Sequence, residues 1–244
     1  MFKLIIGLGN PGPDYRHTYH NAGALFADYL IGDAGSRPPT PYEIKARYGP
    51  SRFHPGSAEA MRRAGMKNPP AIAPARLALR LEAGRYGLSH WRTGTKLFEY
   101  ARLPGNIILI KPLIFMNDSG AAVRSALKYF KIRAEELLLA HDDSDISLGK
   151  YKLSFGRGAG GHKGVESAIR ALGGKNFWRL RFGIRTVARN KTTRTAQKAG
   201  DFVLKNISEA SLKKLYSAFA DANANVIEND TLPPPMGVKE VSGN

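Results

Sequence analysis

Three short strings in this chain place polar side chains where chemistry could occur. GLGNPG with the nearby TYHNAG contributes Asn10 and His20, FMNDSG contributes Asn117, and LLLAHDDSD contributes Asp142. The strings accompany apolar runs typical of buried strands, and side chains that leave strand ends in an α/β sheet converge on a ligand. The set combines a base, a carboxylate and two amides, without an obvious nucleophile or metal cage. It therefore indicates hydrolysis by an activated water molecule.

His20 and Asp142 have the residue types that proton transfer requires. A carboxylate beside an imidazole fixes its tautomer and orientation, and the other ring nitrogen can then take a proton from water. Two alternatives remain open. A histidine in a polar loop is usually an ordinary surface residue, and His141 with the acids of 142–145 could bind a metal. The EF-hand spacing and its closing glutamate are absent, so an acidic capping loop is a better interpretation than a metal site.

The string from Phe115 to Asn117 places an aromatic ring and the thioether of Met116 beside a carboxamide. This combination suits a peptide or a base that rests on an apolar surface while the amide holds its backbone. Ordinary core packing followed by an asparagine turn is the alternative interpretation.

GLGNPG also fits the dinucleotide-binding fingerprint G-x-G-x-x-G, and Asp33 lies near the position expected for a ribose-binding acid. That acid should close a second strand, whereas Asp33 follows an amphipathic helical stripe and opens a proline-rich segment. A second match, from Gly156 to Gly161, shows how easily the pattern arises in a glycine-rich chain. The dinucleotide interpretation is therefore the less favoured one.

Hydrophobic periodicity predicts strands that alternate with helices along the chain. The expected strands are Phe2–Leu8, Lys96–Leu103, Ile107–Lys111, Leu137–Ala140, Lys150–Phe155 and Trp178–Arg185. The expected helices are Asn21–Ile31, Ser119–Ile132, Gly161–Leu172 and Ser208–Ile227. This alternation predicts a three-layer α/β/α domain.

One segment interrupts the alternation. Between residues 35 and 84 lie eight of the fifteen prolines, and nine Lys or Arg against three Glu. This composition predicts a long, basic, partly mobile insertion. The tail 229–244 carries three consecutive prolines and is expected to fray. The expected organisation is one domain over residues 1–228, interrupted at about 35–84 and followed by a flexible tail.

The chain is strongly basic, with a net charge of +17 and a pI near 10.1. Between Lys175 and Lys198 there are eight Lys or Arg and no acidic residue. A stretch this one-sided in a chain this basic favours nucleic acid as the partner over a merely solvated surface. The phosphate-binding candidates in the stretch are Lys175, Arg181, Arg185 and Arg189.

Composition also excludes several classes of protein. Without cysteine the chain has no thiol catalysis, no cysteine-bound zinc and no disulfide. No apolar run approaches the ~18–20 residues that span a bilayer, so no membrane partner is expected. The first expected strand begins at Phe2 or Lys3, which leaves no room for a signal or transit peptide. We expect a cytoplasmic protein, with the mitochondrial matrix as the alternative.

Taken together, the strings resemble the bacterial-type peptidyl-tRNA hydrolase family. GLGNPG-x-x-Y-x-x-T-x-HNAG matches across Gly7 to Gly23, KPLIFMNDSG matches at Lys111 to Gly120, and AHDDSD is followed by GGHKG and FVL. The resemblance implies an α/β/α fold with a mixed, mostly parallel central sheet. It also implies cleavage of the ester that joins a peptide to tRNA, with peptidyl-tRNA as the partner and no metal or organic cofactor.

The resemblance further implies roles for individual residues. His20 is the general base and Asp142 supports it, while Asn10 contacts the substrate and discriminates blocked from free aminoacyl ends. The substrate-binding candidates are Tyr15, Phe115, Met116, Asn117 and Lys163.

The chain departs from the family pattern in two places. Lys163 stands where the family has Asn in GGHNG, and the insertion is longer and more basic than the usual connection. An ammonium only donates hydrogen bonds, whereas a carboxamide both donates and accepts. The alternative is therefore a catalytically weak or inactive RNA-binding protein on the same fold, associated with splicing or the ribosome. In either case we expect a monomer.

Overall fold

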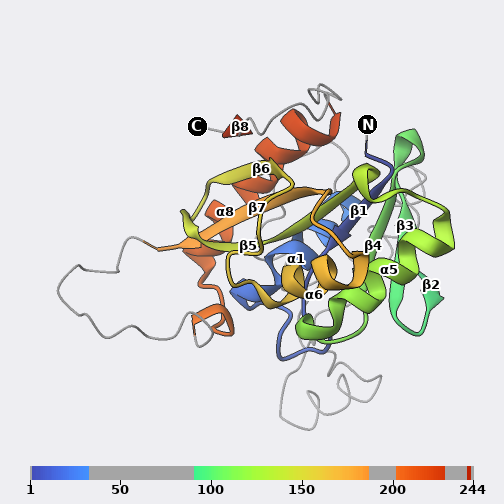
Figure 1. Cartoon of the computed structure of the whole chain (residues 1–244). Helices are drawn as coiled ribbons and strands as arrows, with labels where there is room; N and C mark the ends of the chain where they lie inside the picture. The colour runs from blue at the N-terminus through green and yellow to red at the C-terminus, as the bar shows by residue number, and fades with distance from the viewer. Residues whose placement is uncertain (1, 33–90, 187–201, 229–240, 243–244) are drawn as a thin grey trace, which may run out of the picture. The chain divides into compact units, whose positions relative to one another are not determined.

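The computed structural model of this protein describes residues 2–32, 91–186, 202–228 and 241–242. Its centre is an eight-stranded sheet in the order β2-β3-β4-β1-β5-β7-β6-β8 (Figure 1). The strands are β1 (Leu4–Gly7), β2 (Arg92–Thr95), β3 (Phe98–Arg102), β4 (Ile108–Pro112), β5 (Leu137–Ser147), β6 (Tyr151–Phe155), β7 (Trp178–Arg185) and β8 (Val241–Ser242).

The four central strands, β4, β1, β5 and β7, run parallel, and the remaining strands pair antiparallel at the two sides. Leu4 of β1 pairs with Ile108 on one side and with Leu137 on the other. Every residue of β1 is buried. A strand covered on both faces is expected to be apolar throughout, which explains the uninterrupted run LIIG.

Helices cover both faces of the sheet (Figure 1). On one face α1 (Ala22–Gly32) packs against α8 (Glu209–Ala222). On the other face α5 (Ser119–Phe130) packs against α6 (Lys163–Leu172). The predicted three-layer α/β/α domain with a mixed sheet is thus confirmed. Short helical turns connect these elements: η1 (Tyr19–Asn21), η2 (Pro104–Asn106), η3 (Met116–Asp118), η4 (Ala134–Glu136) and the π-helical η5 (Asn223–Glu228).

A contact between two glycines fixes the beginning of α1 against β1. A Cβ on Gly7 would overlap the carbonyl group of Gly23, so glycine at Gly7 lets the two backbones meet directly. The amide of Ala24 then donates to the carbonyl of Leu8 at 2.9 Å. The turn that precedes α1 is thereby held at the carboxyl end of β1. This arrangement also argues against dinucleotide binding, because no helix opens directly at the GLGNPG string.

Several element boundaries differ from the sequence-based expectation. β5 continues to Ser147 instead of ending at Ala140, so Asp142 lies within a strand and not in the loop that follows one. The physical reason is β7, which pairs with β5 as far as Asp143 and again at Ser147. The strand β2 was not expected at all. Its sequence, RTGT, has no apolar run, and its antiparallel pairing with β3 forms it.

Part of the expectations falls outside the described residues. These include the insertion at about 35–84, Arg189, Asp33 and most of the tail. Within the tail, Val241–Ser242 pairs with β6 as an additional antiparallel strand. None of the helices in the described ranges has the length and apolar character needed to cross a bilayer.

Candidate functional site

A pocket of about 190 Å³ lies where the second half of β5 meets the segment before α6. The elements that contribute to it come from four distant parts of the sequence. Its polar lining consists of His20, Asp142, Asp143, Ser144, His162 and Lys163. The pocket therefore brings together the predicted base, its predicted carboxylate and Lys163.

Asp142 is the centre of a three-residue hydrogen-bond chain. Its Oδ1 atom lies 2.9 Å from Nδ1 of His20 and 2.9 Å from Nε2 of His162. Nδ1 of His162 accepts a hydrogen bond from the amide of Val165 at 3.3 Å, so the ring hydrogen sits on Nε2. With Nδ1 of His20 donating to the same oxygen, the lone pair of His20 Nε2 remains available for a proton.

Asp142 is ionised in this setting although it is only 3% exposed. Burial alone would raise its pKa, but the charge interaction with His162 and the hydrogen bonds from His162 and His20 outweigh burial and hold the pKa well below the ordinary range. A carboxylate that remains charged beside an imidazole stabilises the imidazolium that forms when the ring takes a proton.

His141 directly precedes Asp142 in β5 and has a different protonation state. Its Nδ1 atom donates to the carbonyl oxygen of Asp142 at 2.7 Å. Burial, followed by the charge interaction with His162, lowers the pKa of His141 well below its ordinary value. His141 is therefore neutral and supports the backbone of Asp142, and it is not a second base.

The segment that carries His20 is fixed from two sides. The ring of Phe202 stacks on Tyr19 with centroids 4.8 Å apart, and the amide of Ile207 donates to the carbonyl of His17 at 2.8 Å. Val203, which follows Phe202, lines the pocket. The FVL string of the sequence thus serves to hold the turn before α1.

Asn10 is held by a reciprocal pair of bonds with Asn21. The amide of Asn10 donates to Asn21 Oδ1 at 2.8 Å, and Asn21 Nδ2 donates back to the carbonyl of Asn10 at 3.0 Å. The side-chain oxygen of Asn10 accepts from the amide of Met116 at 2.8 Å. Because the oxygen is engaged, the Nδ2 group of Asn10 is the part of this side chain available as a hydrogen-bond donor to a ligand.

The FMND string divides between the core and the surface. Met116 is 4% exposed and belongs to the apolar core between the sheet and α5–α6, so ordinary core packing is correct for its side chain. Phe115 is 52% exposed and meets Tyr15 edge to face, with ring centroids 6.1 Å apart. Asn117 is exposed in η3. Tyr15, Phe115 and Asn117 do not line the pocket itself.

Lys163 begins α6 at the mouth of the pocket. Its Nζ atom lies 3.1 Å from Oε2 of Glu166, and its side chain is 69% exposed. An exposed ion pair between residues one helical turn apart contributes little to stability. Lys163 can therefore exchange Glu166 for a ligand at a small cost in stability.

The cations of the basic stretch that begins at Lys175 differ in their exposure and in their partners. Arg179 is buried, and Arg181 pairs with Asp143 at 2.8 Å. Lys175 is exposed, as is Arg185, whose Nη2 atom lies 3.3 Å from Ser147 Oγ. The alternation of apolar and basic residues in β7 therefore does not create a continuous row of cations in solvent.

Metal binding can be judged at the same three residues. His20, Asp142 and His162 form the one group of histidine and acidic side chains in the described ranges whose ligand atoms lie close enough together, within 4.8 Å. Two imidazoles and a carboxylate suit Zn²⁺. A metal ion on His20 Nδ1 would displace the hydrogen that now bonds Asp142, so metal binding and the hydrogen-bonded chain exclude each other.

Two residues of this site were missed by sequence reasoning. His162 stands in the GGHKG string, yet that string reads as the glycine-led start of a helix and only Lys163 was assigned from it. Asn21 stands beside His20 and was read as the first residue of a helix. Their role depends on contacts with Asp142 and Asn10, which are distant in the sequence and leave no local pattern.

Comparisons with known proteins agree with this geometry. The chain matches the profile of the family described as Peptidyl-tRNA hydrolase over residues 4–59 and 79–232. It is 34% identical over 203 residues to a peptidyl-tRNA hydrolase of Bordetella parapertussis, covering 83% of this chain and 70% of that protein. A peptidyl-tRNA hydrolase of Geobacter metallireducens is 32% identical over 239 residues, with coverages of 97% and 93%.

The fold gives the same result. The crystal structure of peptidyl-tRNA hydrolase from Acinetobacter baumannii superposes with a TM-score of 0.62 and 25% sequence identity, covering 91% of this chain and 85% of that chain. The profile match and the two relatives each extend over most of the chain, and the profile match includes the strings that form the pocket. The chain therefore belongs to the peptidyl-tRNA hydrolase family.

Proposed function

We propose that this protein hydrolyses the ester bond between a peptide, or an N-blocked amino acid, and tRNA, with His20 as the general base. The observation that carries the proposal is the 2.9 Å contact between His20 Nδ1 and Asp142 Oδ1 in the pocket. It leaves His20 Nε2 as the ring nitrogen that can take a proton. Membership of the family supports the same substrate class.

The reaction needs only water and the residues of this site. His20 Nε2 takes a proton from a water molecule as its oxygen attacks the ester carbonyl carbon. The tetrahedral intermediate carries a negative charge on the former carbonyl oxygen, which the Nδ2 group of Asn10 can stabilise. The bond to the ribose oxygen then breaks, and the imidazolium of His20 returns the proton to that oxygen. The products are the free acid and tRNA with an intact hydroxyl.

Asp142 and His162 act on His20 and not on the substrate. The carboxylate orients the imidazole and stabilises its protonated form, which raises the basicity of Nε2 during the reaction. His162 donates to the same oxygen and so limits the movement of Asp142. This support allows His20, in the short helical turn η1, to hold a geometry suited to proton transfer.

The substrate is expected to extend from the pocket in two directions. One group of candidate contacts lies close in sequence to Asn10 or to Met116, whose amide bonds to Asn10: Tyr15, Phe115 and Asn117. Their side chains offer ring faces and an amide for the acyl or nucleotide part of the substrate. The tRNA part carries phosphates, for which the candidates are Lys163, Lys175, Arg181 and Arg185. Arg181 lies next to the pocket through its ion pair with Asp143.

The proposal is tested by supplying two substrates that differ in one group. The protein is incubated with N-acetyl-aminoacyl-tRNA and with the same aminoacyl-tRNA carrying a free amino group, and the released acid is measured. Release from the blocked substrate alone is the expected result. Retention of both acyl groups by a protein that still binds tRNA would contradict hydrolysis and favour an RNA-binding role.

A further inference from the structure

Arg179 is a charged residue in the middle of the sheet with only 2% of its surface exposed. It lies in β7, opposite Leu139 of β5 on one side and Ser154 of β6 on the other. Leu139 belongs to the apolar core under α5 and α6, and Arg179 faces the same side because paired residues share a face of a sheet. A guanidinium in this position loses its hydration and requires a compensating contact.

The compensating contact is with the backbone of the segment 156–161, which joins β6 to α6. Nη1 of Arg179 donates to the carbonyl oxygen of Gly158 at 2.6 Å. A hydrogen bond from a charged donor is about twice as strong as a neutral one. The segment includes three glycines with positive φ, and a second backbone bond, from Gly156 N to the carbonyl oxygen of Phe177 just before β7, is long at 3.4 Å. The segment therefore needs an anchor to keep one shape.

The remaining hydrogen-bond donors of Arg179 impose a desolvation cost, which a role in packing alone does not explain. Nε and Nη2 are buried without a hydrogen-bond partner among the described residues, and so is Ser154 Oγ on the adjacent strand. Burial, with the nearby charges of Arg181 and Arg157, lowers the pKa of Arg179 to about 10, so the group is still charged at neutral pH. An apolar side chain would avoid this desolvation but could not hold Gly158.

The anchored segment ends at the pocket. It leads directly into His162, which caps α6 and donates to Asp142 Oδ1 at 2.9 Å. We propose that Arg179 is a positioning residue, which holds the 156–161 segment through Gly158 so that His162 stays bonded to Asp142 and Asp142 keeps His20 oriented. Its effect on catalysis rests on the proposed function, whereas its effect on His162 does not.

The first test is kinetic. Arg179→Met should lower kcat for N-acetyl-aminoacyl-tRNA by about tenfold to a hundredfold, the usual effect of a small misplacement of catalytic groups, and leave KM nearly unchanged. Arg179→Lys keeps the charge but loses the planar fork, so its loss should be smaller. Arg170→Met is the matched control because Arg170 is exposed on α6. A rise in KM with normal kcat would instead identify Arg179 as a substrate contact and overturn the proposal.

The second test asks whether Arg179 acts through His162. In the His162→Ala background, Arg179→Met should cause little further loss, because the group that it positions is already gone. Losses that multiply would show that Arg179 acts independently of His162. If Arg179→Met does not fold, the same cycle is carried out with Arg179→Lys.

The third test does not depend on activity. Long-range proton–nitrogen NMR spectra of the imidazole rings should show a changed Nε2 signal of His162 in Arg179→Lys and an unchanged one in Arg170→Met. Unchanged His162 signals in Arg179→Lys would refute the positioning role. A wild-type protein that fails to cleave the ester, but whose His162 signal responds to Arg179→Lys, would refute the proposed function and leave the positioning role intact.

Discussion

One oxygen atom of Asp142 accepts hydrogen bonds from two imidazoles, so the positions of His20 and His162 are coupled through a single atom. The neutral ring of His141 holds the backbone of the same aspartate from below. The proposed base, His20, is therefore held in place by Asp142 of β5 and, through it, by the N-cap residue of α6, and not by its own segment alone. Changes at each of these positions should affect the same chemical step.

His20→Ala should reduce ester cleavage by about 10²–10⁴-fold, the usual share of a general base. Binding of deacylated tRNA should stay close to that of the wild type, because the proposed phosphate contacts involve other residues. The measurement is single-turnover cleavage of N-acetyl-aminoacyl-tRNA together with a tRNA binding titration. His17→Ala, in the same loop, is the matched control. Near-normal cleavage by His20→Ala would remove His20 from the mechanism.

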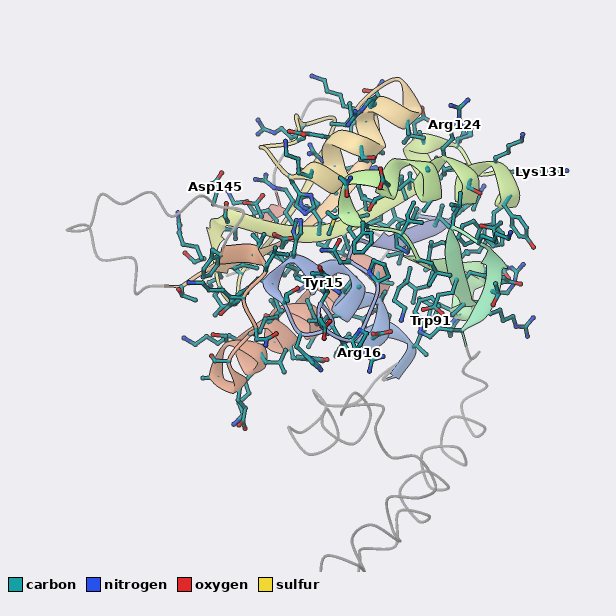
Figure 2. The ribbon with its side chains drawn as sticks, turned by 90° about the horizontal axis from the view of Figure 1, so that it is seen from below. Tyr15, Arg16, Trp91, Arg124, Lys131 and Asp145 are labelled. Carbon is teal, nitrogen blue, oxygen red and sulfur yellow. The ribbon has the colours of Figure 1, made fainter. Side chains whose placement is uncertain are left out.

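Asp142→Asn should also slow cleavage, by about one to two powers of ten, which is a smaller loss than that caused by His20→Ala. The neutral side chain no longer stabilises the imidazolium of His20, and its amide can donate to Nδ1, which moves the ring hydrogen to Nε2 in only part of the molecules. The matched control is Asp145→Asn, three positions further along β5 at an exposed site (Figure 2). Comparable rates for the two variants would argue against pairing of Asp142 with His20.

At the scale of residues, the sequence predicted those whose chemical type indicates a role and missed those whose role depends on tertiary contacts. His20 and Asp142 were predicted to pair as base and carboxylate, and their side chains do lie within hydrogen-bond distance; their catalytic roles stay predictions. Arg179 was only counted in the basic stretch that favours a nucleic-acid partner, because the alternation of residue types along a strand does not indicate what packs on each face. His162 was passed over because its neighbours resemble a helix start.

At the scale of elements, β5 shows why boundaries are harder to predict than elements. The apolar run Leu137–Ala140 was correctly read as a strand, but the polar residues after it were assigned to a loop. They remain in the sheet because β7 supplies hydrogen-bond partners as far as Asp143 and again at Ser147. Pairing with a strand some 40 residues later is a tertiary effect that local propensity does not encode. The helices α1, α5, α6 and α8, which depend on local periodicity, were all expected.

The starts of β1 and β5 are linked by Lys3 and Glu136, and this link should depend on pH. The hydrogen bond from Lys3, followed by that from the Arg133 backbone, lowers the pKa of Glu136 from 4.5 to about 2. Between these values the unfolded chain binds more protons than the folded one, so the stabilisation is complete above pH 4.5 and is lost as the pH falls through about 2.

Lys3→Met should therefore lower the melting temperature at pH 6 by the equivalent of less than about 1 kcal/mol, because Lys3 is largely exposed. The difference from the wild type should shrink as the pH approaches 2, near the folded-state pKa of Glu136. Thermal unfolding followed across this range gives the measurement. Lys213→Met, which breaks the exposed pair with Glu209 on α8, is the control. A difference that does not change with pH would assign the effect of Lys3 to packing of its aliphatic stem.

At the scale of the whole molecule, the chain carries a net charge of +17, and the cations among its described residues differ in whether they have acidic partners. Many cations have acidic partners, including Lys3, Lys111, Lys163 and Arg181. The outer side of α5 differs. Arg124, Lys128 and Lys131 are exposed at helical spacing there, and none has an acidic partner within the described ranges. Figure 2 shows Arg124 pointing outward from this helix and Lys131 pointing outward just after its end.

Unpaired cations on a helix that begins beside Asn117 should contribute to binding of a polyanion. Replacing Arg124 and Lys128 by Gln should weaken tRNA binding and reduce the slope of its logarithmic salt dependence by roughly 1–2 units, since fewer counterions are released. The measurement is tRNA affinity at several salt concentrations. Lys213→Gln on α8, on the opposite face of the sheet, should leave the slope unchanged. A slope that does not respond would place the phosphate contacts elsewhere on the protein.

The short strand β8 has a consequence for handling the protein. β6 lies at the side of the sheet, and Val241–Ser242 occupies its outer edge in antiparallel pairing. A chain ended at Glu228 would expose the amide and carbonyl groups of β6, and an open strand edge is a template for another molecule. The shortened protein should keep its activity per molecule yet self-associate in concentrated solution, which light scattering would detect. If it stays monodisperse, the edge is protected by other means, and the last residues can be removed before crystallisation.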